Sequence, residues 1–130
     1  MIYRVLTADL VEAIHEDVLN PGELPGRARD KSLDSAIARV DNRLAYGFLK
    51  DRYDLAATYA VMIARGHCFN DGNKRTAFRS MDISLALNGV VVQWQVETIG
   101  PLMVRCAQGL VEETEFAAWL RREGTSPNLL

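Results

Sequence analysis

The stretch Arg65-Gly-His-Cys-Phe-Asn-Asp-Gly-Asn-Lys-Arg75 is a run of small and polar residues that separates two apolar segments of the chain. The preceding segment, residues 51–66, carries apolar side chains at helical spacing and ends at a glycine, which predicts a helix. The following segment, residues 76–87, is apolar on almost every side. A helix of that kind is usually buried, so we expect residues 76–87 to form the central helix of the fold.

Four further segments with helical spacing complete the predicted fold. Thr7 and Ser32 are suitable N-caps for the first two of them, and residues 98–108 and 111–122 make up the other two. The side chains expected to face the core in the first three helices are Leu10, Ile14, Val18, Ile37, Val40, Leu44, Phe48, Leu55, Tyr59 and Met62. Those expected to pack in the last helix are Phe116, Trp119 and Leu120. The fold class is therefore predicted to be all-α, a compact bundle of about six helices.

The connections between the helices differ in length and composition. Residues 20–31 contain two Pro-Gly pairs and clustered charge, typical of an irregular exposed loop, and either a functional loop or a solvated linker fits them. Residues 90–94 are rich in β-branched side chains but have no partner strand nearby, so we interpret them as a connector. We expect one domain over residues 1–130, with a frayed tail over residues 124–130.

Composition limits the classes of function. Fifteen Lys and Arg residues against seventeen Asp and Glu leave a net charge of -2, so direct nucleic-acid binding is not expected. Cys68 and Cys106 fit no disulfide framework, which predicts free thiols in a reducing compartment. The sequence has no apolar run of about twenty residues and does not begin like a signal peptide, so we expect a cytoplasmic protein without membrane contact.

The polar stretch contains several groups suited to phosphate chemistry. His67 has the side chain best suited to proton transfer near neutral pH, and Asp71 offers the hard oxygen ligands that Mg²⁺ prefers. Residues 73–75 are expected to begin the next helix, where free backbone N–H groups and the helix dipole favour anions. Gly66 and Gly72 permit sharp turns or a close approach of the backbone to a ligand.

Each of these residues also has an ordinary structural interpretation. His67 could be a helix cap, Asp71 part of a turn, Asn73 an N-cap, and the two cations after Asn73 a solvated pair. Phe69 is expected to anchor the loop to the core, and Cys68 to be structural. It is the order of the residues together that favours a functional site.

The nine residues His67–Arg75, which we call the motif, resemble the signature of the Fic/Doc family, His-x-Phe-x-(Asp/Glu)-(Gly/Ala)-Asn-(Gly/Lys)-Arg. The chain agrees with this pattern at every position that the pattern constrains. The resemblance covers roughly residues 1–123 and is particularly close to the Doc branch of the family. The other stretches that carry it are Leu24-Pro-Gly26, Ala57-Thr-Tyr59, Ala64-Arg-Gly66 and Asn73-Lys-Arg-Thr-Ala77.

Two positions differ from the members of the family that transfer AMP. Those members have a glycine after the asparagine and a second arginine three positions beyond the first, where this chain has Lys74 and Phe78. Arg79 is no substitute, because one helical position rotates a side chain by about 100°. Doc-type members share the lysine, and the resemblance implies that they bind the nucleotide in a reversed sense and transfer its terminal phosphoryl group.

The resemblance also implies a role for each residue. His67 would be the catalytic base and Asp71 the ligand of Mg²⁺, with ATP as the nucleotide substrate. The residues implied to hold the nucleotide phosphates are Gly72, Asn73, Lys74 and Arg75, with Arg65 as a weaker candidate.

The resemblance further implies the toxin of a toxin–antitoxin pair, with elongation factor Tu as the protein modified and a Phd-type antitoxin as partner. Self-inhibiting Fic proteins carry (Ser/Thr)-x-x-x-Glu-(Gly/Asn), but here the only glutamate followed by Gly or Asn is Glu123, and Trp119 stands four residues before it. We therefore expect inhibition by another chain. The alternatives are AMP transfer by the same site, a metal-dependent hydrolase, which two ligands poorly support, and a non-enzymatic regulator.

Overall fold

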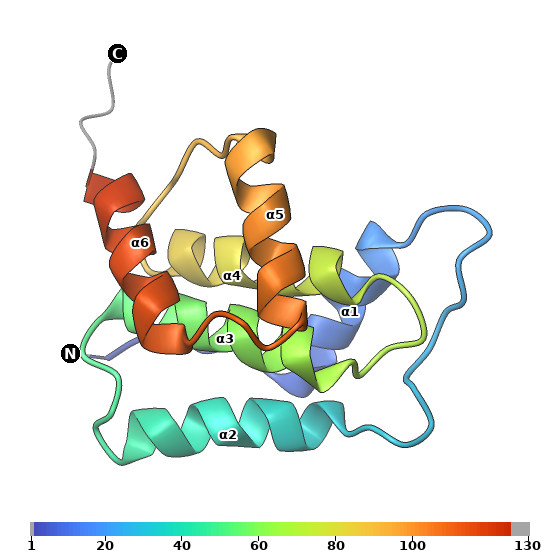
Figure 1. Cartoon of the computed structure of the whole chain (residues 1–130). Helices are drawn as coiled ribbons and strands as arrows, with labels where there is room; N and C mark the ends of the chain where they lie inside the picture. The colour runs from blue at the N-terminus through green and yellow to red at the C-terminus, as the bar shows by residue number, and fades with distance from the viewer. Residues whose placement is uncertain (1, 126–130) are drawn as a thin grey trace.

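The computed structural model describes residues 2–125, which form six helices arranged as a compact bundle without a β-sheet (Figure 1). The helices are α1 (Ala8–Val18), α2 (Leu33–Ala45), α3 (Arg52–Gly66), α4 (Asn73–Leu87), α5 (Val96–Ala107) and α6 (Glu113–Thr125). The all-α prediction is confirmed. Residues 126–130, most of the predicted tail, lie outside the described part of the chain. Over residues 2–125, no helix is long and apolar enough to span a bilayer.

The central helix is α3, which precedes the motif, so the expectation that residues 76–87 form it was wrong. Eleven of the fifteen residues of α3 are buried, against six of the fifteen residues of α4. Helix α3 packs against α2, α4, α5 and α6, and Figure 1 shows it between α2 and α4. Alanines at positions 56, 57, 60 and 64 let these neighbours approach closely on all sides, whereas α4 exposes a polar face that includes Arg79.

Side-chain caps begin the first three helices, and those at Thr7 and Ser32 were predicted from the sequence. The hydroxyl of Thr7 accepts a hydrogen bond from the backbone N–H of Leu10, and the hydroxyl of Ser32 accepts one from Ser35. Asp51 caps α3 by accepting hydrogen bonds from the N–H groups of residues 53 and 54. Helix α4 differs, because its N-cap residue is Gly72 and no side chain caps it.

Two predicted core residues lie at the surface instead. Leu10 is 37% exposed, because the buried face of α1 is turned by one position toward Val11, Ile14 and His15. Phe48 is 71% exposed because α2 ends at Ala45, before the chain reaches it. In contrast, Phe116 and Leu120 are buried as predicted, and residues 90–94 form a connector.

Candidate functional site

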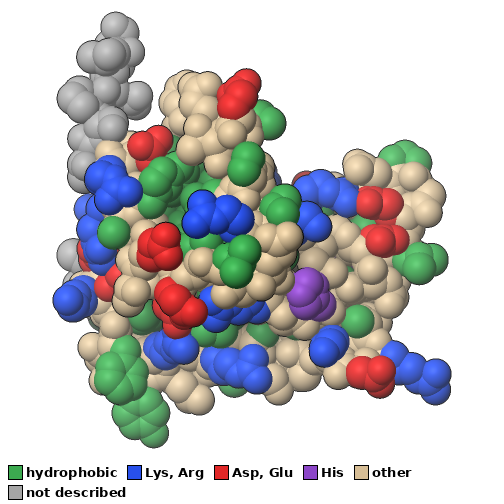
Figure 2. All heavy atoms as spheres, viewed as in Figure 1, with side chains coloured by type: hydrophobic (Ala, Val, Ile, Leu, Met, Phe, Trp, Pro, Cys, Tyr) green, Lys and Arg blue, Asp and Glu red, His purple; other side chains and the backbone are tan. Residues whose placement is uncertain are grey.

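The connection between α3 and α4 presents His67 to solvent. A Cβ atom at position 66 would lie 2.8 Å from the Sγ atom of Cys68, so the glycine allows the chain to fold back tightly there. His67 follows in the left-handed conformation, with φ 47°, while Cys68 and Phe69 are buried. This alternation leaves the imidazole of His67 exposed. Figure 2 shows a solvent-exposed histidine side chain with Lys or Arg side chains nearby in the same view.

Phe69 anchors the connection by stacking on a second histidine, which the sequence analysis did not identify. The rings of Phe69 and His15 are nearly parallel, with 3.8 Å between their centroids, and His15 is 1% exposed. The Nε2 atom of His15 lies 2.7 Å from the backbone oxygen of Asp71. Because a carbonyl oxygen can only accept, Nε2 carries the hydrogen. His15, which lies on α1, therefore contacts both the middle and the end of the connection between α3 and α4.

Asn73 closes the connection from the other side. Its Oδ1 atom accepts a hydrogen bond from the backbone N–H of Phe69 at 3.0 Å, and its Nδ2 atom donates to the Phe69 carbonyl at 2.8 Å. Gly72, with φ 77°, begins α4 in a conformation that other residues rarely adopt. Since no side chain caps α4, the backbone N–H groups of its first turn remain available beside the motif. Such a helix N-terminus favours an anion.

The loop of residues 20–28 is largely exposed, as predicted, and it also contacts the motif. Glu23 forms an ion pair with Arg75, and the N–H of Leu24 donates to the Oδ2 atom of Asp71 at 2.8 Å. An antiparallel bridge pairs Arg27 with Phe69, and the N–H of Ala28 donates to the Cys68 carbonyl at 2.7 Å. Two consecutive loop residues thus contact Arg75 and Asp71, the side chains predicted to bind phosphate and Mg²⁺.

Glu23 was not identified from the sequence either. The hydrogen bond from Arg75 is the main reason why the pKa of the Glu23 carboxyl group is lowered, so the group is ionised at neutral pH. Arg75 also donates to the backbone oxygen of Val18 at 2.6 Å. The guanidinium group is therefore held by the end of α1 and by the loop.

Arg65 points to another part of the molecule. Its guanidinium group donates to the backbone oxygens of Gly109 and Val111, at 3.3 and 2.9 Å, and pairs with Glu112. These contacts stabilise the connection between α5 and α6. The geometry does not support the predicted contact of Arg65 with phosphate.

Two other predictions concern the thiols and the metal. Cys68 and Cys106 are buried free thiols, and burial raises the pKa of both, to about 11 for Cys106, which makes neither a reactive nucleophile. Over residues 2–125, no three His, Cys, Asp or Glu side chains gather as a metal-binding cluster. Asp71 alone still suits Mg²⁺, which commonly combines one or two carboxylates with substrate phosphates and water.

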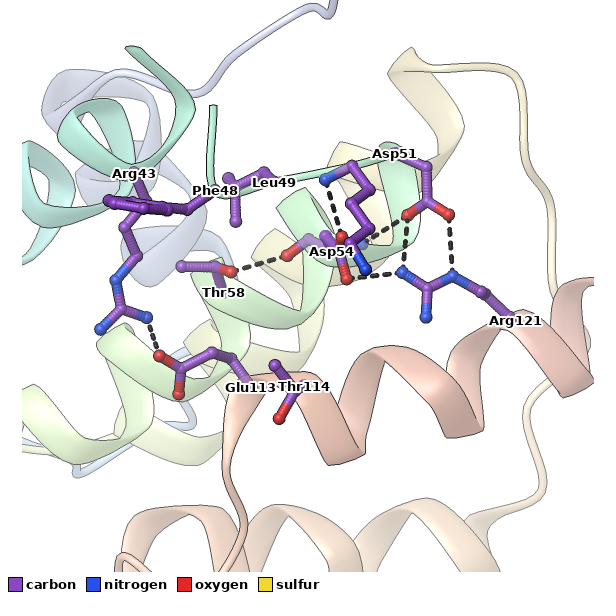
Figure 3. A pocket seen from close by; sticks show the side chains of 10 residues that line it. Arg43, Phe48, Leu49, Asp51, Asp54, Thr58, Glu113, Thr114 and Arg121 are labelled. Atoms are coloured by element: carbon purple, nitrogen blue, oxygen red, sulfur yellow. Dashed lines mark hydrogen bonds and ion pairs between the residues drawn. The ribbon is translucent and has the colours of Figure 1, made fainter. Parts of the chain in front are cut away.

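A hollow of about 550 Å³ lies beside the N-terminal end of α3, away from the motif. Figure 3 shows that the charged side chains around it point toward one another. Arg121 donates to the carboxylates of Asp51 and Asp54, and Arg43 pairs with Glu113. Because these charges are neutralised within the chain, we interpret this cluster as structural.

Comparison with known proteins agrees with the motif. Residues 5–85 match the sequence model of the Fic/DOC family. The protein kinase Doc of Escherichia phage P1 is 37% identical over 120 residues, which cover 92% of this chain and 94% of that protein. The similarity therefore extends well beyond the motif, along most of both chains.

Proposed function

Because the chain belongs to the Fic/Doc family, we propose that it transfers the γ-phosphoryl group of ATP to a serine or threonine hydroxyl of a target protein. One observation carries this proposal. The exposed imidazole of His67 and the uncapped N-terminus of α4 lie at the two ends of a single short connection. This placement would bring a proton acceptor and a phosphate site onto the same segment, and the 37% identity to a protein kinase favours a phosphoryl group as the group transferred.

His67 acts as the general base in this proposal. The oxygen of the target hydroxyl attacks the γ-phosphorus and forms a new P–O bond, while the bond to the bridging oxygen breaks and ADP leaves. The hydroxyl proton passes to a ring nitrogen of His67. General-base catalysis of this kind is worth about 10²- to 10⁴-fold in rate.

The first turn of α4 binds the phosphates. Backbone N–H groups that follow Gly72 and the ammonium group of Lys74 face negative charge on the phosphate oxygens, and Arg75 adds a second cation. Asn73 keeps the connection in shape through its two hydrogen bonds to Phe69. Mg²⁺ bound by Asp71 would neutralise further charge on the phosphates.

We extend the proposal to a biological role as the toxin of a toxin–antitoxin pair. The target would be elongation factor Tu, its modification would arrest translation in the cytoplasm, and a Phd-type antitoxin would inhibit the enzyme. The family resemblance and the identity to phage P1 Doc support this part.

The test is incubation with purified elongation factor Tu, Mg²⁺ and ATP labelled at either the α- or the γ-phosphorus. We expect only the γ label on the target, and none with the His67→Ala variant. An α label on the target would show AMP transfer instead. If neither label reaches elongation factor Tu, the proposed target is wrong, and a label on other proteins of a cell extract would then still support phosphoryl transfer.

A further inference from the structure

An apolar groove of about 250 Å³ lies between α4 and α5, next to the motif. We call it the α4–α5 groove. Lys74 and Arg75 line one end of it, at the start of α4. The other lining side chains are apolar, and they include Phe78, Ile99, Met103 and Val104. The groove therefore joins a cationic end, where we place the phosphates, to an apolar body about one helical turn away.

Gly100 leaves the α5 wall of this groove open. It lies inside a helix, where glycine is less stable than alanine, and no atom beyond its two chain neighbours and the adjacent backbone of α5 lies within 4 Å of the position that its Cβ would occupy. Close packing against a neighbour therefore does not explain the glycine. Pro101 follows it, and a residue before proline in a helix meets steric crowding at its Cβ. Whatever the contribution of Pro101, a larger side chain at position 100 would extend into the groove.

We propose that the α4–α5 groove binds the aromatic base of a nucleoside triphosphate whose phosphates lie at the N-terminus of α4. This inference rests on the proposed function, because the phosphate site is the same. The charge at one end of the groove and its volume favour this ligand. The cations at one end complement a polyphosphate, and a volume of about 250 Å³ suits a single flat base and its ribose better than a helix of a protein partner.

The lining also determines how selective the site is. Phe78 offers an aromatic ring for contact with the base, whereas the side chains from α5 offer no hydrogen-bonding groups to read its edge. Discrimination between bases depends on such groups. The groove therefore accepts adenine and guanine with similar affinity.

The experiment compares the binding of ATP, GTP and inorganic tripolyphosphate by calorimetry, in the presence of Mg²⁺, to the whole chain and to three variants. Gly100→Leu fills the groove. Gly100→Ala is the matched control, because it carries the same crowding against Pro101 but only one methyl group. Val104→Gln tests the groove from a half-exposed position, which keeps the experiment interpretable if Gly100→Leu does not fold.

We expect ATP and GTP to bind within about threefold of each other and at least about tenfold more tightly than tripolyphosphate, since an apolar contact of this size is worth one to two kilocalories per mole. Gly100→Leu should reduce ATP affinity to that of tripolyphosphate, without changing tripolyphosphate affinity. Val104→Gln should weaken ATP binding a few-fold, and Gly100→Ala should leave it nearly unchanged.

Other results would overturn the inference in distinguishable ways. If the whole chain binds ATP and tripolyphosphate equally, or if neither Gly100→Leu nor Val104→Gln changes ATP affinity, the base lies elsewhere while the proposed function stands. A strong preference of the whole chain for ATP over GTP would refute the absence of base discrimination. If the chain binds none of the three ligands, both the proposed function and the groove assignment fail.

Discussion

Charged and polar side chains gather at both ends of α3, but their partners differ. At the N-terminal end, Asp51 caps the helix and Arg121 bridges Asp51 and Asp54, so the charges are satisfied by the chain itself (Figure 3). At the C-terminal end, the side chains of His67 and Lys74 make no hydrogen bond or ion pair with any of the described residues. The uncapped start of α4 lies beside them.

This difference separates stability from function. A polar group that is paired within the fold adds to the free energy of unfolding, whereas a polar group left open to solvent adds little and remains available to a ligand. The size of a hollow does not distinguish a functional end from a structural one, because the hollow of about 550 Å³ lies at the N-terminal end, where the charges are paired, and the α4–α5 groove of about 250 Å³ lies next to the motif. Whether the polar groups are paired within the chain does distinguish them.

The largest effect should follow from His67→Asn. Asparagine tolerates the left-handed conformation but cannot act as the base, so the fold is preserved. We expect phosphoryl transfer to fall by about 10²- to 10⁴-fold, measured with γ-labelled ATP, at an unchanged thermal unfolding midpoint. Full activity of this variant would mean that His67 is not the catalytic base.

Asp51→Ala should have the opposite effect, a loss of stability with unchanged activity. Loss of the N-cap of α3, together with an ion-pair partner of Arg121, should lower the free energy of unfolding by about 1–2 kcal/mol, measured by urea denaturation. The rate of phosphoryl transfer by the folded protein should not change. Asp51→Asn is the control, since it keeps a cap but loses the charge. A loss of activity without a loss of stability would contradict the assignment of this end as structural.

Glu23→Gln, next to the motif, should have a smaller effect, which is on ATP affinity. Removing the carboxylate that pairs with Arg75 frees a cation for the phosphates, so ATP affinity should increase. An ion pair that is partly exposed is worth little, which limits the increase to about two- to fivefold. Glu16→Gln removes the same charge from an exposed position of α1 and is the matched control. Weaker ATP binding would instead mean that Glu23 positions Arg75 for the ligand.

The smallest effect is that of acid pH on the contribution of Asp51 to the free energy of unfolding. Burial alone would raise the pKa of the Asp51 carboxyl, but hydrogen bonds from Arg121 and from backbone N–H groups outweigh it and lower the pKa. The ionised form therefore stabilises the fold above the unfolded-state pKa of about 3.9, and this stabilisation is lost as pH falls through the lower folded-state value.

Urea denaturation of the chain and of Asp51→Asn between pH 6 and pH 2 measures this contribution. Because the Asp51 side chain is 35% exposed, we expect the difference between the two proteins to stay below about 1 kcal/mol. It should shrink as the pH falls toward the lower limit. A difference that grows on acidification would contradict the lowered pKa.

Much of the fold could be predicted from local pattern. The caps at Thr7 and Ser32, the helix start at residue 73 and the anchor at Phe69 were predicted because each depends on neighbouring residues. The central helix was not predicted, because several of the buried residues of α3 are alanines. Alanine carries little hydrophobic signal but allows close packing. Its central position depends on neighbours far away in the sequence.

The site shows the same limit. The motif itself was identified, but His15 and Glu23 were missed because their partners lie 56 and 52 residues away. A histidine four residues after Val11 on the buried face of α1 was the available signal for His15. Arg65 was favoured as an anion contact only because it adjoins the motif in sequence, and its side chain points elsewhere.

The stacked pair of His15 and Phe69 makes the shape of the motif depend on α1. Until α1 has docked, the ring of Phe69 has no face to lie on and the carbonyl of Asp71 has no donor. A chain whose α1 is still detached would thus hold a loose motif and poor catalysis. Enzymatic activity would therefore require α1 to be docked on the motif.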